Sequence, residues 1–377
     1  MPLNAIRRTL EVALVSASLL SLTQPFSLLA DDDGSFGSAG FVYVMTNQAS
    51  GNTVLVYHRN ADGSVSKVQE VSTGGHGSGG GGDPLGSQGA LTLSDDGRLL
   101  LAVDAGSNEV SSLAVTEDGL QFVSKAPSGG MKPVSVALRG DTAYVLNAGG
   151  TPNVTAFRLG LSGQLTAIPS SSRPLPGGAN SAPAQVDITP DGEVLVVTEK
   201  NTNRIDLFPI DDGSMGAPSS VPSDGAVPFG FAFGHDRTLI VSEAAASTIS
   251  SYHIQSVENS PTLQTITKSL ADGGAAACWI LTDRGGRLAF AANSGTNTIS
   301  SFTVSPNGDL QLLAPVAGRT ASGTVPIDMA LTRTGAFLYV IGTGNGTLTG
   351  FRVQNGQLSP VALVSGLPLS IQGVAAR

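Results

Sequence analysis

The sequence predicts an all-β chain folded as a seven-bladed β-propeller, because one unit of about 40 to 50 residues recurs seven times in 377 residues. Each unit contains a hydrophobic strand, a tight turn that is often Asp-Gly, and a second strand that usually ends in Asn, Asp or Glu. A third strand follows and usually ends in an aromatic residue. The clearest copy spans residues 184–208, with Asp191-Gly192 as its turn and Phe208 at its end.

The spacing of the first strands predicts how the ring closes. These strands end 44 to 50 residues apart, at Leu93, Leu138, Ile188, Phe233, Leu281, Leu331 and Ala375. The seventh lies at the C-terminus, whereas residues 41–46 form a second-type strand with no first strand before it. We therefore expect the C-terminal strand to complete the N-terminal blade, which leaves no long exposed sheet edge.

The composition supports a single β domain over residues 40–377. The 48 glycines and the charged fraction of only 13% fit a chain with many turns. Strands rich in Val, Ile, Leu and aromatic residues fit blades that pack on both faces. Turns such as Asp96-Gly97 and Asn307-Gly308 provide residues that accept a positive φ. No stretch has a clear helical period.

The first 30 residues have the pattern of a signal peptide. Arg7-Arg8 precedes an apolar run over residues 12–22, and the small residue Ala30 precedes Asp31. The run is too short to span a bilayer. We expect residues 1–30 to be removed on export and residues 31–39 to be a disordered lead-in. The protein would then be secreted or periplasmic; an uncleaved anchor or a disordered tail is the alternative.

Charge and cysteine content restrict the partners. The formal net charge is −9 and no Lys/Arg cluster follows the leader, which argues against nucleic acid and anionic membranes. Cys278 is the single cysteine, so no disulfide framework is possible, and we expect it to be structural. We expect a monomer that binds a small molecule such as a lactone or a carbohydrate.

Polar residues follow the second strand in six of the seven units. They are Asn47, Asp104, Asn147, Glu199, Glu243 and Asn293, with Gly342 in the seventh unit. The residues that enter the first strands include Gln88, Lys132, Gln185, Trp279 and Asp328. Because consecutive strands of a blade are antiparallel, we expect both sets to ring one mouth of the central channel.

Two interpretations of these residues remain open. Asn and Asp at strand ends often bond backbone groups of the next turn, which explains the Asn residues equally well. For Asp104, Glu199, Glu243 and Asp328 we favour a pocket, because clustered carboxylates need a cation, a shared proton or a ligand. Oxygen ligands would suit Ca²⁺, but positions spread around a channel define no coordination set. No other cofactor is predicted.

Two further features have structural alternatives. Trp279 either packs between blades or forms a stacking wall for a ligand. Residues 74–84 are rich in glycine but lack the Lys-Ser/Thr ending and the following helix of a phosphate-binding loop. We interpret them as a flexible loop between blades.

The repeated unit, with its Pro-Asp-Gly turn and its Asn-x-φ-x-x-Phe third strand, resembles the lactonase family of seven-bladed propellers over residues 41–377. Bacterial 6-phosphogluconolactonase and fungal carboxymuconate-lactonising enzymes are similar to it. The resemblance implies a pocket role for Glu199. The family's Gly-Pro-Arg-His motif is matched by residues 182–185, Ala-Pro-Ala-Gln, and Gly89 stands where the family has a His. An anionic substrate would need such cationic contacts.

Three functions follow from these observations. The first is an exported lactonase-like hydrolase for an uncharged lactone or sugar derivative, with Glu199 or Glu243 as general base and amides such as Asn147 and Gln185 polarising the carbonyl. The second is a non-catalytic propeller that binds a ligand or partner at the same mouth. The third is a structural surface protein. Converging carboxylates would favour the first, and a mouth plugged by the Gly-rich loop would favour the third.

Overall fold

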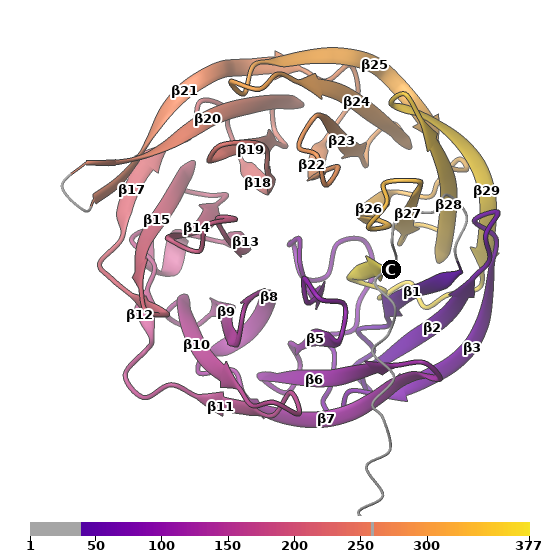
Figure 1. The fold of residues 1–377 in the computed structure, drawn as a ribbon, viewed down its shortest axis with the longest axis horizontal. Coiled ribbons are helices and arrows are strands. Elements are labelled where there is room, and N and C mark those ends of the chain that lie inside the picture. Colours follow the sequence, from indigo (N-terminus) through magenta and orange to yellow (C-terminus); the bar gives the residue numbers. More distant parts are fainter. Residues whose placement is uncertain (1–38, 258–259) are drawn as a thin grey trace, which may run out of the picture. The chain divides into compact units, whose positions relative to one another are not determined.

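The computed structural model describes residues 39–257 and 260–377, which form seven antiparallel sheets around a central axis (Figure 1). The predicted seven-bladed propeller is confirmed. The predicted signal peptide and nearly all of the predicted lead-in lie outside the described residues.

Each blade contains four strands in the order inner, second, third, outer, and blades 3 and 4 carry an extra short strand. The inner strands of blades 1 to 7 are β30 (Val374–Ala376), β4 (Leu91–Leu93), β8 (Met131–Arg139), β13 (Pro183–Ile188), β18 (Pro228–Phe233), β22 (Ala277–Thr282) and β26 (Pro326–Leu331). The second strands are β1 (Gly40–Met45), β5 (Leu99–Asp104), β9 (Thr142–Gly149), β14 (Val194–Glu199), β19 (Thr238–Glu243), β23 (Leu288–Asn293) and β27 (Phe337–Gly342).

The third and outer strands complete the blades. The third strands are β2 (Thr53–Arg59), β6 (Glu109–Thr116), β10 (Asn153–Leu159), β15 (Arg204–Asp211), β20 (Thr248–Val257), β24 (Thr298–Val304) and β28 (Thr347–Gln354). The outer strands are β3 (Val65–Ser72), β7 (Gly119–Pro127), β11 (Leu165–Ala167), β16 (Ser214–Met215), β21 (Ser260–Ala271), β25 (Leu310–Arg319) and β29 (Gln357–Ser365). The extra strands are β12 (Arg173–Pro174) and β17 (Ser219–Pro222).

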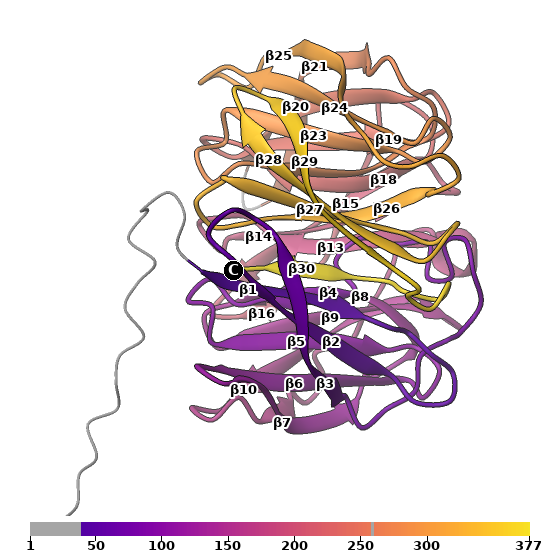
Figure 2. The ribbon, with the colours of Figure 1, turned by 90° about the vertical axis from the view of Figure 1, so that its right-hand side faces the viewer.

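The ring closes through the C-terminal strand, as predicted. β30 pairs antiparallel with β1, with Tyr43 opposite Ala375 (Figure 2). Each inner strand contacts the next, and β30 contacts both β26 and β4. Blade 1 is therefore assembled from both ends of the propeller.

Aromatic residues near the ends of the third strands fill the spaces between blades. They are Tyr57, Phe157, Phe208, Tyr252, Phe302 and Phe351, and none is more than 2% exposed. Leu113 takes this position in blade 2. The second strands are apolar on both faces because neighbouring blades cover both, as in Val196 and Val197 of β14. The repeat therefore encodes the core directly.

The Asp-Gly turns are stabilised locally. In the turn between β13 and β14, the Thr189 hydroxyl donates to Asp191 Oδ1 at 2.6 Å. Gly192 adopts φ +80°, a conformation that costs a residue with a Cβ, and its N–H donates to the Thr189 carbonyl at 2.7 Å. This geometry explains why the repeat has Ser or Thr two residues before Asp.

Helix is limited, within the described ranges, to the 3₁₀ turn η1 (Gly178–Asn180). No helix in this part of the chain is long and apolar enough to cross a membrane.

Candidate functional site

The start of each inner strand lies beside the end of the second strand of the same blade. Glu199 pairs with Pro183, Glu243 with Pro228 and Asn293 with Ala277. The two predicted sets of residues therefore share one end of the channel. We call this end the strand-start mouth, and the other end, where the inner strands finish, the strand-end mouth.

Polar side chains at the ends of the second strands are buried beneath glycines of the loops that enter their blades. The pairs are Asp104 with Gly75, Asn147 with Gly130, Glu199 with Gly177, Glu243 with Gly225 and Asn293 with Gly274. All five polar residues are 0% exposed. A Cβ on any of these glycines would lie 2.1–2.6 Å from the polar side chain. The side chains thus hold loops of their own blades.

Hydrogen bonds saturate these carboxylates. Asp104 accepts from Asn52 Nδ2 at 2.9 Å and from the Thr73 hydroxyl at 2.6 Å. Glu243 accepts from the Gly225 N–H at 2.7 Å and from the Ser250 hydroxyl at 2.6 Å. These contacts fit the alternative in which strand-end residues bond groups of neighbouring turns. Their predicted contacts with a ligand stay predictions.

Glu199 shares its buried position with a second acid. It accepts from the Gly177 N–H at 2.9 Å and from the Thr202 hydroxyl. Burial, together with the hydrogen bond to Glu199, raises the pKa of Asp206 to about 8. The raised pKa favours the protonated form of Asp206 at neutral pH. This pair of acids lies inside a blade.

Residues that enter the inner strands join blades to one another. Gln185 Nε2 donates to the Phe231 carbonyl at 3.0 Å, and its Oε1 accepts from the Phe231 N–H at 2.7 Å. Gln88 makes the same two bonds to Ile280, which joins blade 2 to blade 6. Both glutamines therefore act as clamps on backbone groups.

The other predicted residues have different environments. Trp279 is 2% exposed and donates to the Ser87 carbonyl at 2.9 Å, which is the core alternative. Asp328 is 4% exposed, and burial raises its pKa to about 7. Lys132 is exposed. Asn47 Oδ1 accepts from the Ser78 N–H in the Gly-rich loop at 2.9 Å.

The continuation of the Gly-rich loop crosses the strand-start mouth. We call residues 83–88 the crossing segment; it belongs to the connection from β3 to β4, which Figure 1 shows inside the ring. The Gln88 N–H donates to the Ala184 carbonyl at 3.1 Å, and Gln372 Nε2 donates to the Ser87 carbonyl at 3.1 Å. Lys200 donates to the Gly86 carbonyl. This segment partly covers the mouth, which counts against a site built on Glu199 and Glu243.

Lys200 bonds the crossing segment at Gly86 and interacts electrostatically with Asp83 at its start, and sequence reasoning missed both residues. Lys200 Nζ lies 4.9 Å from the centroid of the Phe229 ring. Burial lowers the pKa of Lys200 to about 8, and the Asp83 charge opposes this shift. Burial raises the pKa of Asp83, opposed mainly by Lys200. Both residues stay partly exposed, so a ligand at this mouth can reach them.

Cys278 lies at the same mouth but has the wrong protonation state for a nucleophile. Burial, assisted by the charge of Asp83, raises the pKa of Cys278 to about 12. The thiol therefore stays protonated at neutral pH, and thiolate chemistry is not available.

Both Lys200 and Asp83 lie next to features that the sequence analysis used. Lys200 directly follows Glu199 at the aligned strand end, and Asp83 ends the glycine run before Pro84. Neither position repeats in other blades, so the alignment of units did not select them.

No group of three or more His, Cys, Asp or Glu side chains in the described ranges is placed to hold a metal ion.

Comparison with known proteins identifies the family. The model of the family described as "Lactonase, 7-bladed beta-propeller" matches residues 35–174, 151–278 and 255–368. The chain belongs to this family. No curated protein matches the sequence.

Solved structures share the lactonase-family fold at low identity. A Bacteroides uniformis protein proposed to be a 6-phosphogluconolactonase is 20% identical, with a TM-score of 0.69 over 90% of this chain and 99% of its own. The periplasmic gluconolactonase of Pseudomonas aeruginosa is 20% identical, with a TM-score of 0.67 over 89% and 99%. A Lactobacillus plantarum protein is 18% identical, with a TM-score of 0.70 over 90% and 99%. At these identities the likeness concerns the fold.

The structure shows how this chain uses the two positions, Gly89 and Gln185, at which the resemblance places a His of the lactonase family. Gly89 has φ +79°, and a Cβ there would lie 3.0 Å from the Ser135 hydroxyl. A His at this position would be strained and crowded. Gln185, at the position of the motif His, is 4% exposed and engaged with the Phe231 backbone. Lys200 and the exposed Lys132 provide positive charge at this mouth instead.

Proposed function

We propose that this chain is an exported hydrolase that opens an uncharged lactone of a sugar acid at the strand-start mouth. One observation carries the proposal: at this mouth the charges of Lys200 and Asp83, both partly buried, act on each other, and Lys200 lies over the Phe229 ring. Membership of the lactonase family supports the reaction class. The likeness to a periplasmic gluconolactonase and the leader-like residues 1–30 support the substrate class and export.

The two side chains supply complementary chemistry. The Asp83 carboxylate accepts a proton from water while the water oxygen attacks the lactone carbonyl carbon. The Lys200 ammonium stabilises the oxyanion that forms on the carbonyl oxygen. When the tetrahedral intermediate collapses, the ring C–O bond breaks and the leaving alkoxide takes the proton from Asp83. The product is a hydroxy acid, and both side chains return to their starting charge states.

The contacts of Asp83 favour its role as the base. Its Oδ1 accepts from the Gly86 N–H at 2.9 Å, and a hydrogen bond from Gln372 also reaches the carboxylate. These bonds orient the carboxylate, while burial raises its pKa and so strengthens it as a base. Lys132 is the other lysine at this mouth and is exposed. Ala184 stands at the position of the family motif's Arg, so this mouth lacks the bidentate guanidinium that would favour a multiply charged substrate.

The test is a panel of uncharged aldonolactones assayed with the wild type and four variants. Asp83→Asn should reduce turnover by roughly 10²–10⁴. Lys200→Met should reduce it by roughly 10²–10³. Lys132→Met is the matched control and should stay within about twofold. Glu199→Gln tests the general base that the sequence predicts. We expect turnover to change little, because the Glu199 side chain is 0% exposed.

The pH profile gives a second readout. Lys200 must be charged, so turnover should fall as the pH rises through about 8. Turnover should rise with pH as Asp83 ionises, so the profile should be bell-shaped. Full activity of Lys200→Met, or loss of activity only in Glu199→Gln, would refute the proposed site.

A non-catalytic binding propeller is the second candidate, because the crossing segment covers part of the mouth. Binding of aldonolactones without turnover, lost in Lys200→Met, would establish this candidate. Export is tested separately by the intact mass of protein recovered from outside the cytoplasm. Recovery of a chain that still carries residues 1–30 would contradict signal cleavage.

A further inference from the structure

A second charged site lies at the strand-end mouth, on the opposite side of the propeller from Lys200 and Asp83. A cavity of about 670 Å³ opens there, over the ends of the inner strands β8, β13, β18 and β26. Its lining includes apolar residues such as Phe233 and the three arginines Arg139, Arg284 and Arg333. The size suits a sugar-sized molecule.

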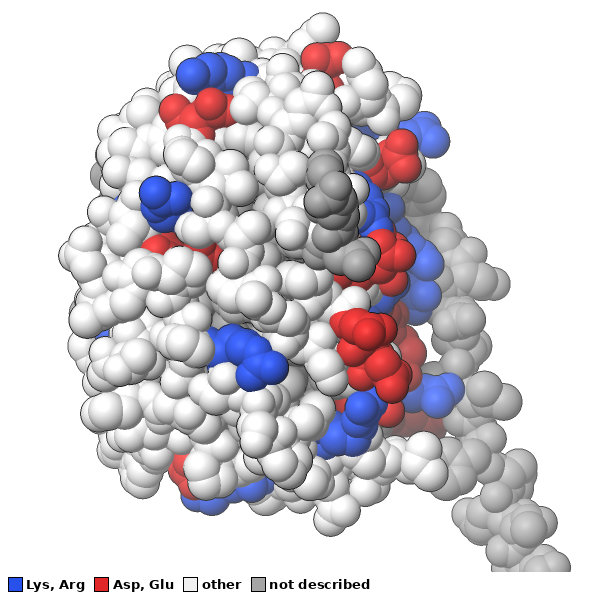
Figure 3. All heavy atoms as spheres, turned by 90° about the vertical axis from the view of Figure 1, so that its left-hand side faces the viewer, with Lys and Arg blue, Asp and Glu red and all other residues white. Residues whose placement is uncertain are grey.

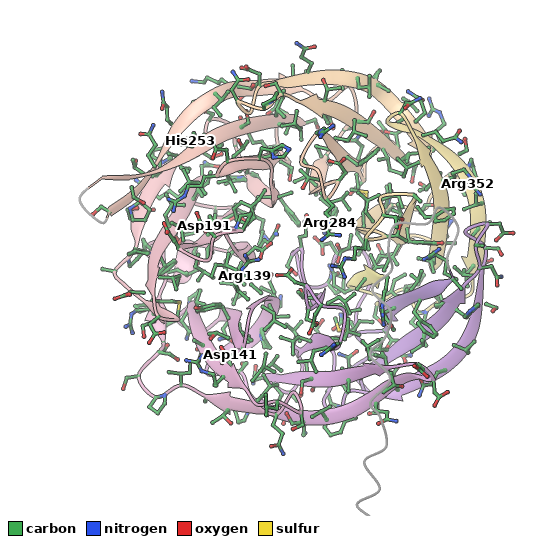
Figure 4. The ribbon with its side chains drawn as sticks, viewed as in Figure 1. Arg139, Asp141, Asp191, His253, Arg284 and Arg352 are labelled. Carbon is green, nitrogen blue, oxygen red and sulfur yellow. The ribbon has the colours of Figure 1, made fainter. Side chains whose placement is uncertain are left out.

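The charge of this cavity reverses that of the protein. The chain has 29 acidic and 20 basic residues, yet the cavity is lined by three arginines against Asp95 and Asp187. Charged side chains gather along the right-hand edge of the molecule in Figure 3. This edge is the face that is turned to the viewer in Figure 1. Strand β30 ends on the same face, as Figure 2 shows. Figure 4 shows Arg139 and Arg284 near the middle of the ring, whereas Arg352 lies at its outer edge.

The arginines differ in how they are held. Arg139 pairs with Asp95 at 3.0 Å and also donates to the Pro190 carbonyl, which fixes its guanidinium at the cavity wall. Arg284 is exposed, and no hydrogen bond or ion pair joins its side chain to another residue within 39–257 or 260–377. One guanidinium is thus oriented in advance, and another has its donors available for a ligand.

A guanidinium presents N–H donors in a fixed fork that matches a carboxylate or a phosphate. Apolar lining residues such as Phe233 would cover the face of a ring or a carbon chain, and Asp187 would accept from a ligand hydroxyl. We propose that this cavity binds a small organic anion whose carboxylate or phosphate group contacts Arg284 and Arg139. This site is separate from the proposed hydrolytic site and does not depend on it.

The test measures binding of four probes to the full propeller by calorimetry: gluconate, glucose 6-phosphate, inorganic phosphate and glucose. We expect one or both organic anions to bind at millimolar or lower concentration, with glucose at least about tenfold weaker because it lacks the charge. Preference for gluconate identifies a carboxylate ligand, and preference for glucose 6-phosphate identifies a phosphate ligand. Binding of inorganic phosphate alone, or of none of the probes, would overturn the proposal.

Matched variants locate the site. Arg284→Gln should weaken binding by about tenfold or more without changing the melting temperature of the free protein, because its side chain is exposed. Arg287→Gln is the control, since Arg287 is exposed in the same turn but does not line the cavity. Lys200→Met should leave this binding unchanged. Equal losses in Arg284→Gln and Arg287→Gln would also overturn the proposal.

Discussion

Glu199 illustrates how one position of the repeat selects its residue type. The side chain fills the space that the absent Cβ of Gly177 leaves, and its carboxylate accepts the Gly177 N–H. Asp, Asn or Glu fills the corresponding space beside a glycine in blades 2 to 6, and in blade 5 Glu243 also accepts from the Gly225 N–H. The polar residue and the glycine are therefore one structural unit, although they lie more than 15 residues apart in the sequence.

The pairing of Glu199 with Gly177 predicts that Gly177→Ala lowers the stability of the fold. The added Cβ would lie 2.1 Å from Glu199 Oε2, so the loop or the buried carboxylate must move. We expect the free energy of unfolding to fall by roughly 1–3 kcal/mol. Gly81→Ala is the control, because its nearest atom would be 3.8 Å away, and it should be nearly neutral. Denaturant unfolding measures both; equal stabilities would show that the glycine is not required.

The pair Glu199 and Asp206 predicts a pH dependence of stability. The folded pKa of Asp206 is about 8, raised above its ordinary value near 3.8 by burial and by Glu199. This group therefore favours folding most strongly below about pH 4, and that contribution is lost as the pH rises toward 8. Asp206→Asn should flatten the stability profile between these pH values. Asp211→Asn, exposed in the same strand, should keep the slope of the wild type. A wild-type slope in Asp206→Asn would contradict the raised pKa of Asp206.

At the scale of elements, the crossing segment connects blades that lie far apart in the sequence. Gln88 Nε2 donates to the Ile280 carbonyl at 2.7 Å, and the Ile280 N–H donates to Gln88 Oε1 at 3.0 Å. Trp279 and Gln372 both donate to the carbonyl of Ser87. Blade 6 and the C-terminal closing segment thus both hold this loop.

Removal of the Gln88 clamp should destabilise the fold. Gln88→Ala leaves the buried N–H and carbonyl of Ile280 without these partners, and we expect a loss of roughly 1–3 kcal/mol in the free energy of unfolding. Gln121→Ala, at an exposed position of β7, is the matched control and should stay within about 0.5 kcal/mol. If both variants unfold at the same denaturant concentration, the clamp contributes nothing to stability.

The sequence predicts the elements well where the determinants are local. The alternation of strands and Asp-Gly turns needs only neighbours such as Thr189, Asp191 and Gly192, and these turns form as expected. The crossing segment could not be predicted, because its contacts reach Ile280, which is 192 residues away from Gln88. The loop looked like a flexible connection since glycine carries no side chain to indicate a contact.

The sequence predicted that the two sets of strand-end residues share one rim, and the strand pairing confirms this. The alignment of units placed the strand ends on one rim, and the pairing of Glu199 with Pro183 agrees with this. It could not show that these side chains turn into their own blades. Lys200 and the three arginines of the strand-end mouth do not recur at a fixed position of the repeated unit. The closed ring brings residues from different blades together at each mouth. A repeat pattern reveals what blades share, whereas these residues differ between blades.

At the scale of the whole molecule, closure joins the two ends of the propeller. Val44 pairs with Val374 in β30, and the Met45 N–H donates to the Gly373 carbonyl at 3.1 Å. Ile371 is 0% exposed. The closing segment also carries Gln372, which holds the crossing segment over the strand-start mouth. Ring closure and the geometry of the proposed hydrolytic site are therefore linked.

Deletion of residues 369–377 should open the ring. The change removes the inner strand of blade 1, exposes the edge of β1, and leaves the buried neighbours of Ile371 and Val374 in contact with water. Unpaired β edges promote association between chains, so we expect a loss of cooperative unfolding or aggregation. Leu369→Ser is the control, because Leu369 is 52% exposed, and it should melt as the wild type does. A synthetic peptide of residues 369–377 should restore cooperative melting to the truncated chain, since it supplies the missing strand. Scanning calorimetry and light scattering measure these outcomes. A truncated chain that stays monomeric and melts at the wild-type temperature would show that β30 does not hold the ring closed.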